Sequence, residues 1–190
     1  MFGMTSTEQN TSTCQIDLDK CLVRIAAGER DALAELYSAT KTAVYGFILS
    51  IVKNATDAED ALQDTYVKIW SAAESYRSQG KPMAWVFTIA RNNATSILRD
   101  KSKTVDIPEE DWQTCYADNP AVSSDDKIVL KAAMETLADD ERQIIMLHAV
   151  GGMKHIEIAK IMGLPLSTVL SKYSRAKKKL QKTLEEGEKA

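Results

Sequence analysis

The 190-residue chain lacks several features that mark particular classes of protein. No apolar run approaches the roughly 20 residues of a membrane-spanning helix, and the amino-terminal stretch has neither the basic nor the apolar segment of a secretory signal. Its three cysteines, Cys14, Cys21 and Cys115, include no CxxC pair. Cys21 lies on a predicted helix stripe, which favours a reduced core thiol over a redox or zinc role. The sequence therefore predicts a cytoplasmic protein without membrane insertion of its own.

Metal ligands and phosphate loops are also scarce. The only histidines, His148 and His155, are separated by Gly151 and Gly152 rather than placed at metal-ligand spacing on one helix. This arrangement favours packing or surface roles for both. We expect no metal site, no cofactor and no catalytic residue.

Strand patterns with turn signals do not occur, and apolar residues recur at helical spacing instead. Residues 1–16 are polar and predict a loose tail. A first helix is expected from Asp17 to Gly28 and a second from about residue 30 to 53. The predicted fold class is all-α, with two small helical domains joined by an acidic linker.

The third predicted helix has an acidic face. Thr56-Asp57-Ala58-Glu59 has the capping-box form, which predicts that Thr56 caps this helix. Asp60, Gln63 and Asp64 share one face with Val67. Acids in a first turn complement the helix dipole, but Asp64 lies two turns in. The opposite stripe is apolar and consists of Leu62, Tyr66, Ile69 and Ala73.

A loop over residues 76–82 leads into a helix from Pro82 to about Lys101. Here Trp85 stands close to Arg91 and Asn92. Aromatic rings beside cationic and amide side chains suit single-stranded nucleic acid, because bases stack on rings and charge holds the backbone. The alternative is a core role for Trp85 and Ile89, which are spaced i, i+4.

Residues 102–124 contain two prolines, no sustained periodicity and an acidic bias, and they read as a domain linker. Ser123 or Ser124 is then expected to cap a helix through Leu137. Asp139 is expected to cap the next helix, which ends at the double glycine.

The stretch from His155 to Leu184 predicts a helix-turn-helix. In its first helix Ile156, Ala159 and Met162 form the apolar stripe, and Gly163 suits a left-handed cap. The second helix opens at Leu166 or Ser167, and its inward residues are Val169, Tyr173, Ala176 and Leu180.

The outer faces of this second helix are basic. From Pro165 to Leu184 there is no acid, although the chain as a whole has 24 Lys+Arg against 27 Asp+Glu. Such a helix can enter a DNA major groove; the alternative is a helical hairpin with a solvated basic face. Six residues supply the charge: Lys172, Arg175, Lys177, Lys178, Lys179 and Lys182.

Three segments, in this order, resemble the extracytoplasmic-function (ECF) group of bacterial sigma factors in the sigma-70 family. They are DAEDALQDTYVKIW at 57–70, AWVFTIARNNA at 84–94 and GGMKHIEIAKIMGLPLSTVLSKYSRAKKKL at 151–180. The resemblance implies sigma domain 2 over 17–101, a linker over 102–124 and sigma domain 4 over 125–185.

What the resemblance implies for single residues falls into three groups. One group docks on the coiled coil of the largest subunit of core RNA polymerase: Asp60, Gln63 and Asp64. The flap of the polymerase is a further expected partner of the chain. A second group takes the opened minus-ten strand and a flipped base: Ser78, Gln79, Gly80, Lys81, Trp85, Arg91 and Asn92. A third group reads the minus-thirty-five element or lies near its phosphates: Thr168, Leu170, Ser171, Lys172, Ser174, Arg175 and Lys178.

Two positions depart from the family pattern. Leu170 and Lys172 stand where a basic residue and an arginine are usual, and lysine lacks the planar fork of arginine. Arg175 is therefore the best candidate for a base or phosphate contact.

The resemblance implies a non-enzymatic sigma factor that directs promoter-specific initiation and is controlled by a dedicated anti-sigma factor. One alternative is a helix-turn-helix regulator that acts without replacing the sigma subunit. Another is an enzyme in which acids of the third helix bind a divalent metal. No histidine or phosphate loop converges on those acids to support this last alternative.

Overall fold

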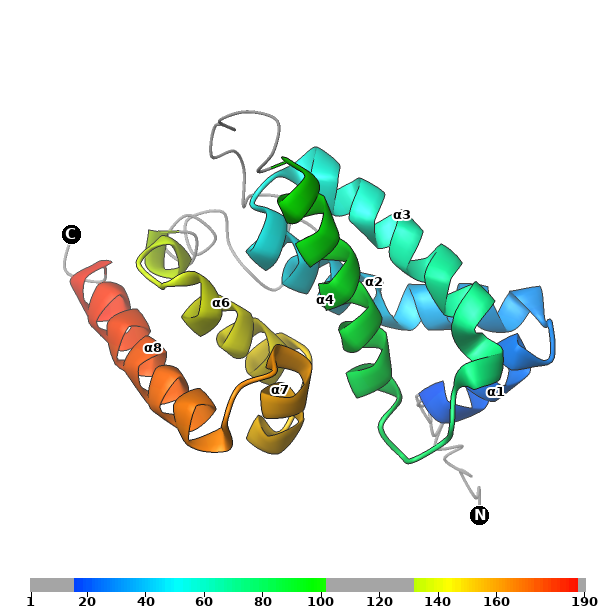
Figure 1. The fold of residues 1–190 in the computed structure, drawn as a ribbon. Coiled ribbons are helices and arrows are strands. Elements are labelled where there is room, and N and C mark those ends of the chain that lie inside the picture. Colours follow the sequence, from blue (N-terminus) through cyan, green and yellow to red (C-terminus); the bar gives the residue numbers. More distant parts are fainter. Residues whose placement is uncertain (1–15, 102–131, 188–190) are drawn as a thin grey trace, which may run out of the picture.

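The computed structural model describes residues 16–101 and 132–187, and the regular structure in both ranges is helical (Figure 1). This confirms the predicted all-α class. The predicted tail, apart from Ile16, and the predicted linker fall outside the described residues. The predicted cap at Ser123 or Ser124 falls outside them as well.

The first domain contains α1 (Leu18–Ala26), α2 (Arg30–Val52), α3 (Ala55–Ala72), the short 3-10 helix η1 (Ala73–Ser75) and α4 (Pro82–Lys101). The long α2 packs against α1, α3 and α4, and α3 also packs against α4. These bounds agree with the helices predicted from periodicity.

Local chemistry explains where the first helices begin and what they bury. The side chain of Asp17 accepts a hydrogen bond from the backbone N–H of Lys20 and caps α1. The stripe below it includes Cys21, a buried free thiol, as predicted. Burial and the nearby Glu35 carboxylate raise the pKa of this thiol, which keeps it protonated and unreactive.

The predicted cap of α3 was wrong. Asn54, not Thr56, is the N-cap, because its side-chain oxygen accepts a hydrogen bond from the backbone N–H of Asp57 at 3.0 Å. Asn in extended backbone is at least as good a cap as Thr, so the helix begins one residue before Thr56. The apolar stripe of Leu62, Tyr66 and Ile69 is buried as predicted.

The second domain contains α6 (Asp139–Ile145), the π-helical turn η3 (Met146–Val150), α7 (His155–Met162) and α8 (Leu166–Gly187). Residues 132–135 are also helical. Asp139 is the first residue of α6 and not its cap, which corrects the prediction by one position. Ala138 is the cap residue, and its backbone N–H is satisfied by the Glu141 carboxylate at 3.1 Å.

The buried face of α7 differs from the predicted stripe. Ile156 is 51% exposed, whereas Ile158 and Ile161 are buried. Glu157, which is not part of the predicted apolar stripe, is buried, and its carboxylate accepts a hydrogen bond from the backbone N–H of Lys154. The left-handed Gly163, with φ at 67°, ends α7 as predicted.

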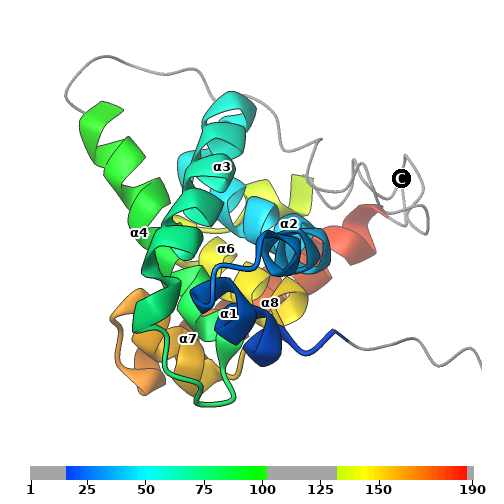
Figure 2. The same cartoon turned by 90° about the vertical axis from the view of Figure 1, so that its right-hand side faces the viewer.

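One cluster of buried side chains runs through both domains. Helix α2 contacts α6 and η3, and α4 contacts α7 (Figures 1 and 2). At the centre, the fully buried Phe87 ring of α4 packs edge-on against Phe47 of α2, with 5.3 Å between ring centroids. The same ring also meets Gly151, where an added Cβ would lie 2.7 Å from a Phe87 ring carbon.

A buried amide joins α3 to α4 and provides a stability test. Asn93 is 3% exposed; its Nδ2 donates to the Ala61 carbonyl at 2.9 Å, and its Oδ1 accepts from Lys68 Nζ. Asn93→Ala should lower the free energy of unfolding by about 1 to 3 kcal/mol, because it leaves buried polar groups unpaired. Urea unfolding measures this.

The adjacent Asn92 is exposed and is the matched control. Asn92→Ala should change the free energy of unfolding by less than about 0.5 kcal/mol. Equal losses in the two variants would contradict the structural role of Asn93.

Candidate nucleic-acid interface

The acidic face of α3 (Asp60, Gln63 and Asp64) is exposed, opposite the buried stripe of the same helix. Val67, one turn further on, is 64% exposed and extends this face with an apolar side chain. In the described part of the chain, neither Asp60 nor Asp64 forms an ion pair. The acids are therefore available to a basic partner.

The turn before α4 presents its side chains to solvent. Ser78, Gln79, Gly80 and Lys81 are exposed, and Gly80 has a φ of 67°, a left-handed conformation that suits glycine. We call these four residues together with Trp85 the loop surface.

Two contacts hold the loop surface in place. Trp85 is half-buried and packs edge-on against Tyr76, with ring centroids 5.1 Å apart. The Tyr76 hydroxyl in turn donates to the Asp19 carboxylate of α1. An anchored aromatic ring beside exposed polar and cationic groups is the arrangement that stacks a base and holds a phosphate.

The remaining predicted strand-binding residues lie along α4 on different sides. Asn92 is seven residues after Trp85 and therefore on the same side of the helix. Arg91 is turned about a third of a revolution away. It is half-buried, and its Nε is buried without a hydrogen-bond partner among the described residues. The structure thus groups Asn92 with the loop surface more closely than Arg91.

A groove between α3 and α4 was not predicted. Its cavity of about 350 Å³ is lined by Lys68, Asn92, Asn93, Ser96 and Arg99, among others. Its cations come from different helices, so no single stretch of sequence shows them together. Lys68 and Asn93 are 25 residues apart in sequence but are hydrogen-bonded in the fold. The basic lining of this groove therefore becomes apparent only in the structure.

The predicted DNA-reading residues of α8 are mostly exposed. Leu170, Ser171, Ser174, Arg175 and Lys178 face solvent, and Thr168 is half-buried. The inward residues Val169 and Ala176 are fully buried, as predicted.

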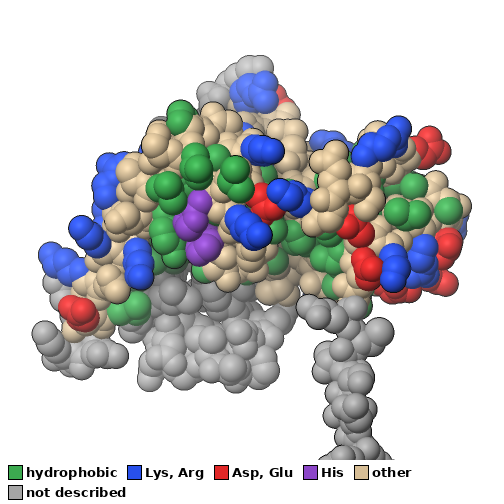
Figure 3. All heavy atoms as spheres, turned by 90° about the horizontal axis from the view of Figure 1, so that it is seen from below, with side chains coloured by type: hydrophobic (Ala, Val, Ile, Leu, Met, Phe, Trp, Pro, Cys, Tyr) green, Lys and Arg blue, Asp and Glu red, His purple; other side chains and the backbone are tan. Residues whose placement is uncertain are grey.

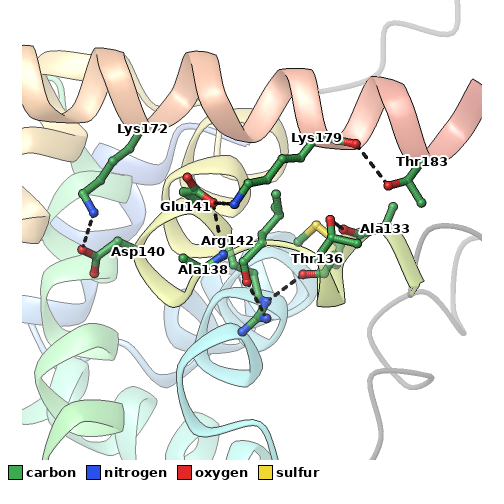
Figure 4. Close-up of polar contacts among 11 residues, drawn as sticks. Ala133, Thr136, Ala138, Asp140, Glu141, Arg142, Lys172, Lys179 and Thr183 are labelled. Atoms are coloured by element: carbon green, nitrogen blue, oxygen red, sulfur yellow. Dashed lines mark hydrogen bonds and ion pairs between the residues drawn. The ribbon is translucent and has the colours of Figure 1, made fainter.

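Two ion pairs fasten α8 to α6 (Figure 4). Lys172 Nζ lies 3.0 Å from Asp140 Oδ2, and Lys179 Nζ lies 2.7 Å from Glu141 Oε2. Burial by itself would raise the pKa of Glu141, but hydrogen bonds from Lys179 and from the Ala138 N–H outweigh it and lower that pKa. Lys172 is thus held by an acid of its own domain, which distinguishes it from the other predicted DNA contacts.

The two histidines meet in space despite their separation in sequence. Their rings stack with centroids 4.5 Å apart, and both contact the Tyr173 ring of α8 edge-on. Figure 3 shows the histidine side chains at the surface next to hydrophobic side chains. His148 Nδ1 donates a hydrogen bond to the Met153 carbonyl oxygen at 2.9 Å. These contacts give both histidines a packing role, which is one of the two roles left open by the sequence.

Across residues 16–101 and 132–187, no group of three or more His, Cys, Asp or Glu side chains could hold a metal ion. The same residues include no helix long and apolar enough to cross a membrane.

Comparison with protein families gives two matches in the expected order. The family model described as Sigma-70 region 2 matches residues 36–104, and the one described as Sigma-70, region 4 matches residues 127–180. Together they cover well over half of the chain. The chain belongs to the sigma-70 family.

The relatives place this sigma factor in the ECF group. It is 29% identical over 176 residues to the ECF RNA polymerase sigma factor SigK of Mycobacterium ulcerans (strain Agy99). The SigK of Mycobacterium bovis (strain BCG / Pasteur 1173P2) is 27% identical over the same length. Each match covers 89% of this chain and 94% of the relative. Sigma factors direct promoter-specific initiation and are not enzymes, as predicted.

Two solved structures share the fold of this sigma factor. The sigma factor RpoE, in complex with the anti-sigma factor NepR from Bartonella quintana, has a TM-score of 0.65 and 26% identity, and the match covers 89% of this chain and 97% of that one. CnrH, in complex with the cytosolic domain of CnrY, has a TM-score of 0.61 and 22% identity, with 88% and 96% covered. The CnrH likeness concerns the fold alone.

The histidine stack predicts an acid-sensitive helix-turn-helix. Burial, together with the neighbouring His148, lowers the pKa of His155 below its ordinary 6.5. The folded protein therefore takes up this proton less readily than the unfolded chain, and its stability should fall as pH drops below about 6.5. Thermal unfolding at about pH 7.5 and 5.5, above the range in which ordinary carboxylates titrate, measures this.

His155→Phe keeps an aromatic ring beside Tyr173 but cannot be protonated. It should remove much of the fall in Tm over this pH interval. An identical fall in the wild type and the variant would contradict a role for the His155 proton.

Proposed function

We propose that the predicted residue groups are the working surfaces of this sigma factor: the acidic face binds core RNA polymerase, the loop surface takes the opened minus-ten strand, and α8 reads the minus-thirty-five element. The observation that carries the proposal is the acidic face. A regulator that used only its helix-turn-helix would have no need for exposed, unpaired acids on α3 of the other domain.

The acidic face suits a protein partner and not DNA. Asp60 and Asp64 are repelled by phosphates, but they complement a basic surface such as the one expected on the coiled coil of the largest polymerase subunit. The neighbouring exposed Val67 adds an apolar contact. Buried Asp57 lies in the first turn of α3 and is set apart from this face.

The loop surface supplies what a captured single strand requires. Trp85 offers a ring for stacking, and Lys81 and Gln79 offer a cation and an amide for the backbone and base edges. Asn92 and the groove lined by Lys68 and Arg99 continue the polar surface along α4. Strand capture would then stabilise the melted promoter.

The exposed side of α8 supplies the second promoter contact. Arg175 presents a guanidinium that can bind a guanine edge bidentately, and Ser171 and Ser174 can bond to bases or phosphates. Leu170, 47% exposed, offers only an apolar contact, such as one to a thymine methyl group. This composition should give the chain a minus-thirty-five preference of its own.

Further parts of the proposal rest on the comparisons. The match ranges support domain limits of 17–101 and 125–185 with a linker between them. The structural likeness to RpoE, solved with the anti-sigma factor NepR, supports control by a protein of that class. Binding to core polymerase and promoter DNA supports action of the chain in the cytoplasm.

In vitro transcription on a promoter library tests the function directly. Core polymerase plus the full chain should initiate from a subset of promoters, and the selected sequences should share two elements. Tight, specific duplex binding by the chain alone, with no initiation when core is added, would favour the helix-turn-helix regulator instead.

Asp64→Arg should abolish assembly with core polymerase, because it places a cation against a basic partner. Gel filtration or fluorescence anisotropy with core enzyme measures assembly. Asp31→Arg is the matched control, since Asp31 is an exposed acid on α2 outside the acidic face. Normal assembly of the Asp64 variant would contradict the docking assignment.

Arg175→Ala should weaken promoter binding by the holoenzyme by about 1 to 3 kcal/mol and relax preference at one base pair. Arg175→Lys, which keeps the charge but not the planar fork, should recover affinity without recovering that preference. Binding to a set of single-base promoter variants separates the outcomes. A uniform loss across all sequences would show a phosphate contact instead of base reading.

A further inference from the structure

Three cations of α8 lie on the side of this helix that turns toward α6. Lys172, Arg175 and Lys179 are spaced by three and then four residues, so their side chains leave α8 on the same side. Figure 4 shows Lys172 and Lys179 reaching from α8 to the first turn of α6. We call these three residues the cationic row.

The two ends of the cationic row are paired with acids, and its middle residue is not. Lys172 Nζ lies 3.0 Å from Asp140 Oδ2, and Lys179 Nζ lies 2.7 Å from Glu141 Oε2. Burial would raise the pKa of Glu141, whereas the hydrogen bond from Lys179 and, more weakly, the charge of Arg175 lower it. Arg175 is thus close to the acids of α6, but it is exposed and forms no ion pair with another described residue.

The position of the Lys172 ammonium disfavours a contact with DNA. The Lys172 side chain is 23% exposed and its Nζ lies against α6, whereas the Asp140 side chain is 46% exposed. A DNA phosphate that approached this ammonium would also meet the Asp140 carboxylate. The contact would therefore either break the ion pair or bring two anions together.

Asp140 differs from its neighbours because it has no evident part in holding α6 together. Asp139 accepts a hydrogen bond from Arg142, and Glu141 accepts one from the backbone N–H of Ala138. Among the described residues, Lys172 is the ion-pair partner of the Asp140 side chain, and this side chain makes no hydrogen bond to any other of them. Asp140 can therefore be changed without removing a contact that shapes α6.

We propose that Asp140 withholds Lys172 from DNA, so that Asp140 limits the affinity of α8 for duplex DNA without changing the sequence that α8 prefers. A lysine–phosphate contact is independent of sequence, whereas the Arg175 guanidinium can read a base edge. Withholding Lys172 therefore removes binding energy that carries no sequence information. This inference rests on the proposed function of α8.

Asp140→Asn tests the proposal, because it removes the charge and keeps the shape of the side chain. The probe is a double-stranded promoter that the holoenzyme transcribes, bound by holoenzyme carrying the full chain at about 0.05 to 0.2 M salt. The freed Lys172 should steepen the slope of log K against log salt by about 0.9 and tighten binding about fivefold at about 0.15 M salt. An unchanged slope and affinity would overturn the proposal.

Lys172→Ala identifies the cation that causes the gain. In the D140N background it should remove the whole gain in slope. In the wild-type background it should change the slope by less than about half as much, because Asp140 already holds the ammonium. Equal changes in the two backgrounds would show that Lys172 reaches DNA despite Asp140, and this result overturns the proposal. A gain that persists in D140N/K172A also overturns it.

Glu135→Gln is the matched control, because it removes one negative charge from an exposed acid of the same domain outside α6. It should leave the slope unchanged. A gain equal to that of D140N would assign the effect to the net charge of the chain and overturn the proposal. Circular dichroism and thermal unfolding check that each variant is folded.

Base preference is the second readout. Binding is measured to single-base variants of the minus-thirty-five element, and D140N should tighten all of these complexes by the same factor, within about twofold. A gain confined to one base pair would make the freed Lys172 a base-reading residue, which contradicts the claim that Asp140 leaves preference unchanged.

The wild-type measurements separate this proposal from the function on which it rests. If wild-type holoenzyme does not distinguish the promoter from one with a replaced minus-thirty-five element, the proposed function of α8 fails, and this inference fails with it. If it does distinguish them, and D140N leaves the salt slope unchanged, the withholding of Lys172 alone is wrong.

Discussion

The packing of Phe87 between Phe47 and Gly151 is the contact on which the arrangement of the molecule depends. The first contact holds α4 on α2 and so fixes the base from which the loop surface projects. The second joins α4 to the start of the helix-turn-helix, where any side chain larger than glycine would collide with the ring. One aromatic side chain thus links the cores of the two domains that carry the proposed DNA-binding surfaces.

Charge is distributed around this core so that each proposed binding surface suits a different partner. Asp60 and Asp64 of α3 are exposed and form no ion pair with other described residues, which suits a basic protein surface. Two acids of α6 instead form ion pairs with α8: Asp140 pairs with Lys172, and Glu141 pairs with Lys179. The remaining outward face of α8, with Arg175 and Lys178, is left for DNA. Ion pairing inside the second domain therefore determines which cations of α8 remain available to contact DNA.

Periodicity and cap chemistry predicted the helices and most buried stripes, because both depend on residues close in sequence. Thr56 was predicted as a cap from its spacing to Glu59, but Asn54 also has a side chain suited to capping, and only the fold decides between them. Glu157 is a charged residue outside the predicted apolar stripe, yet it is buried, because its carboxylate accepts from the Lys154 N–H at the start of α7 and pairs with Lys81 of the other domain. The histidine stack and the basic groove at Lys68 were also not predicted, because each joins residues from separate elements.

Promoter opening is the central function proposed for this chain. Permanganate reactivity of unpaired thymines measures it most directly. With core polymerase and the full chain together, thymines near the minus-ten element should become reactive, and replacing Trp85 by Ala should reduce this reactivity. With either component alone, the duplex should stay closed. Full initiation from a promoter whose thymines remain unreactive, or opening that does not require the chain, would contradict the assignment of strand capture to the loop surface.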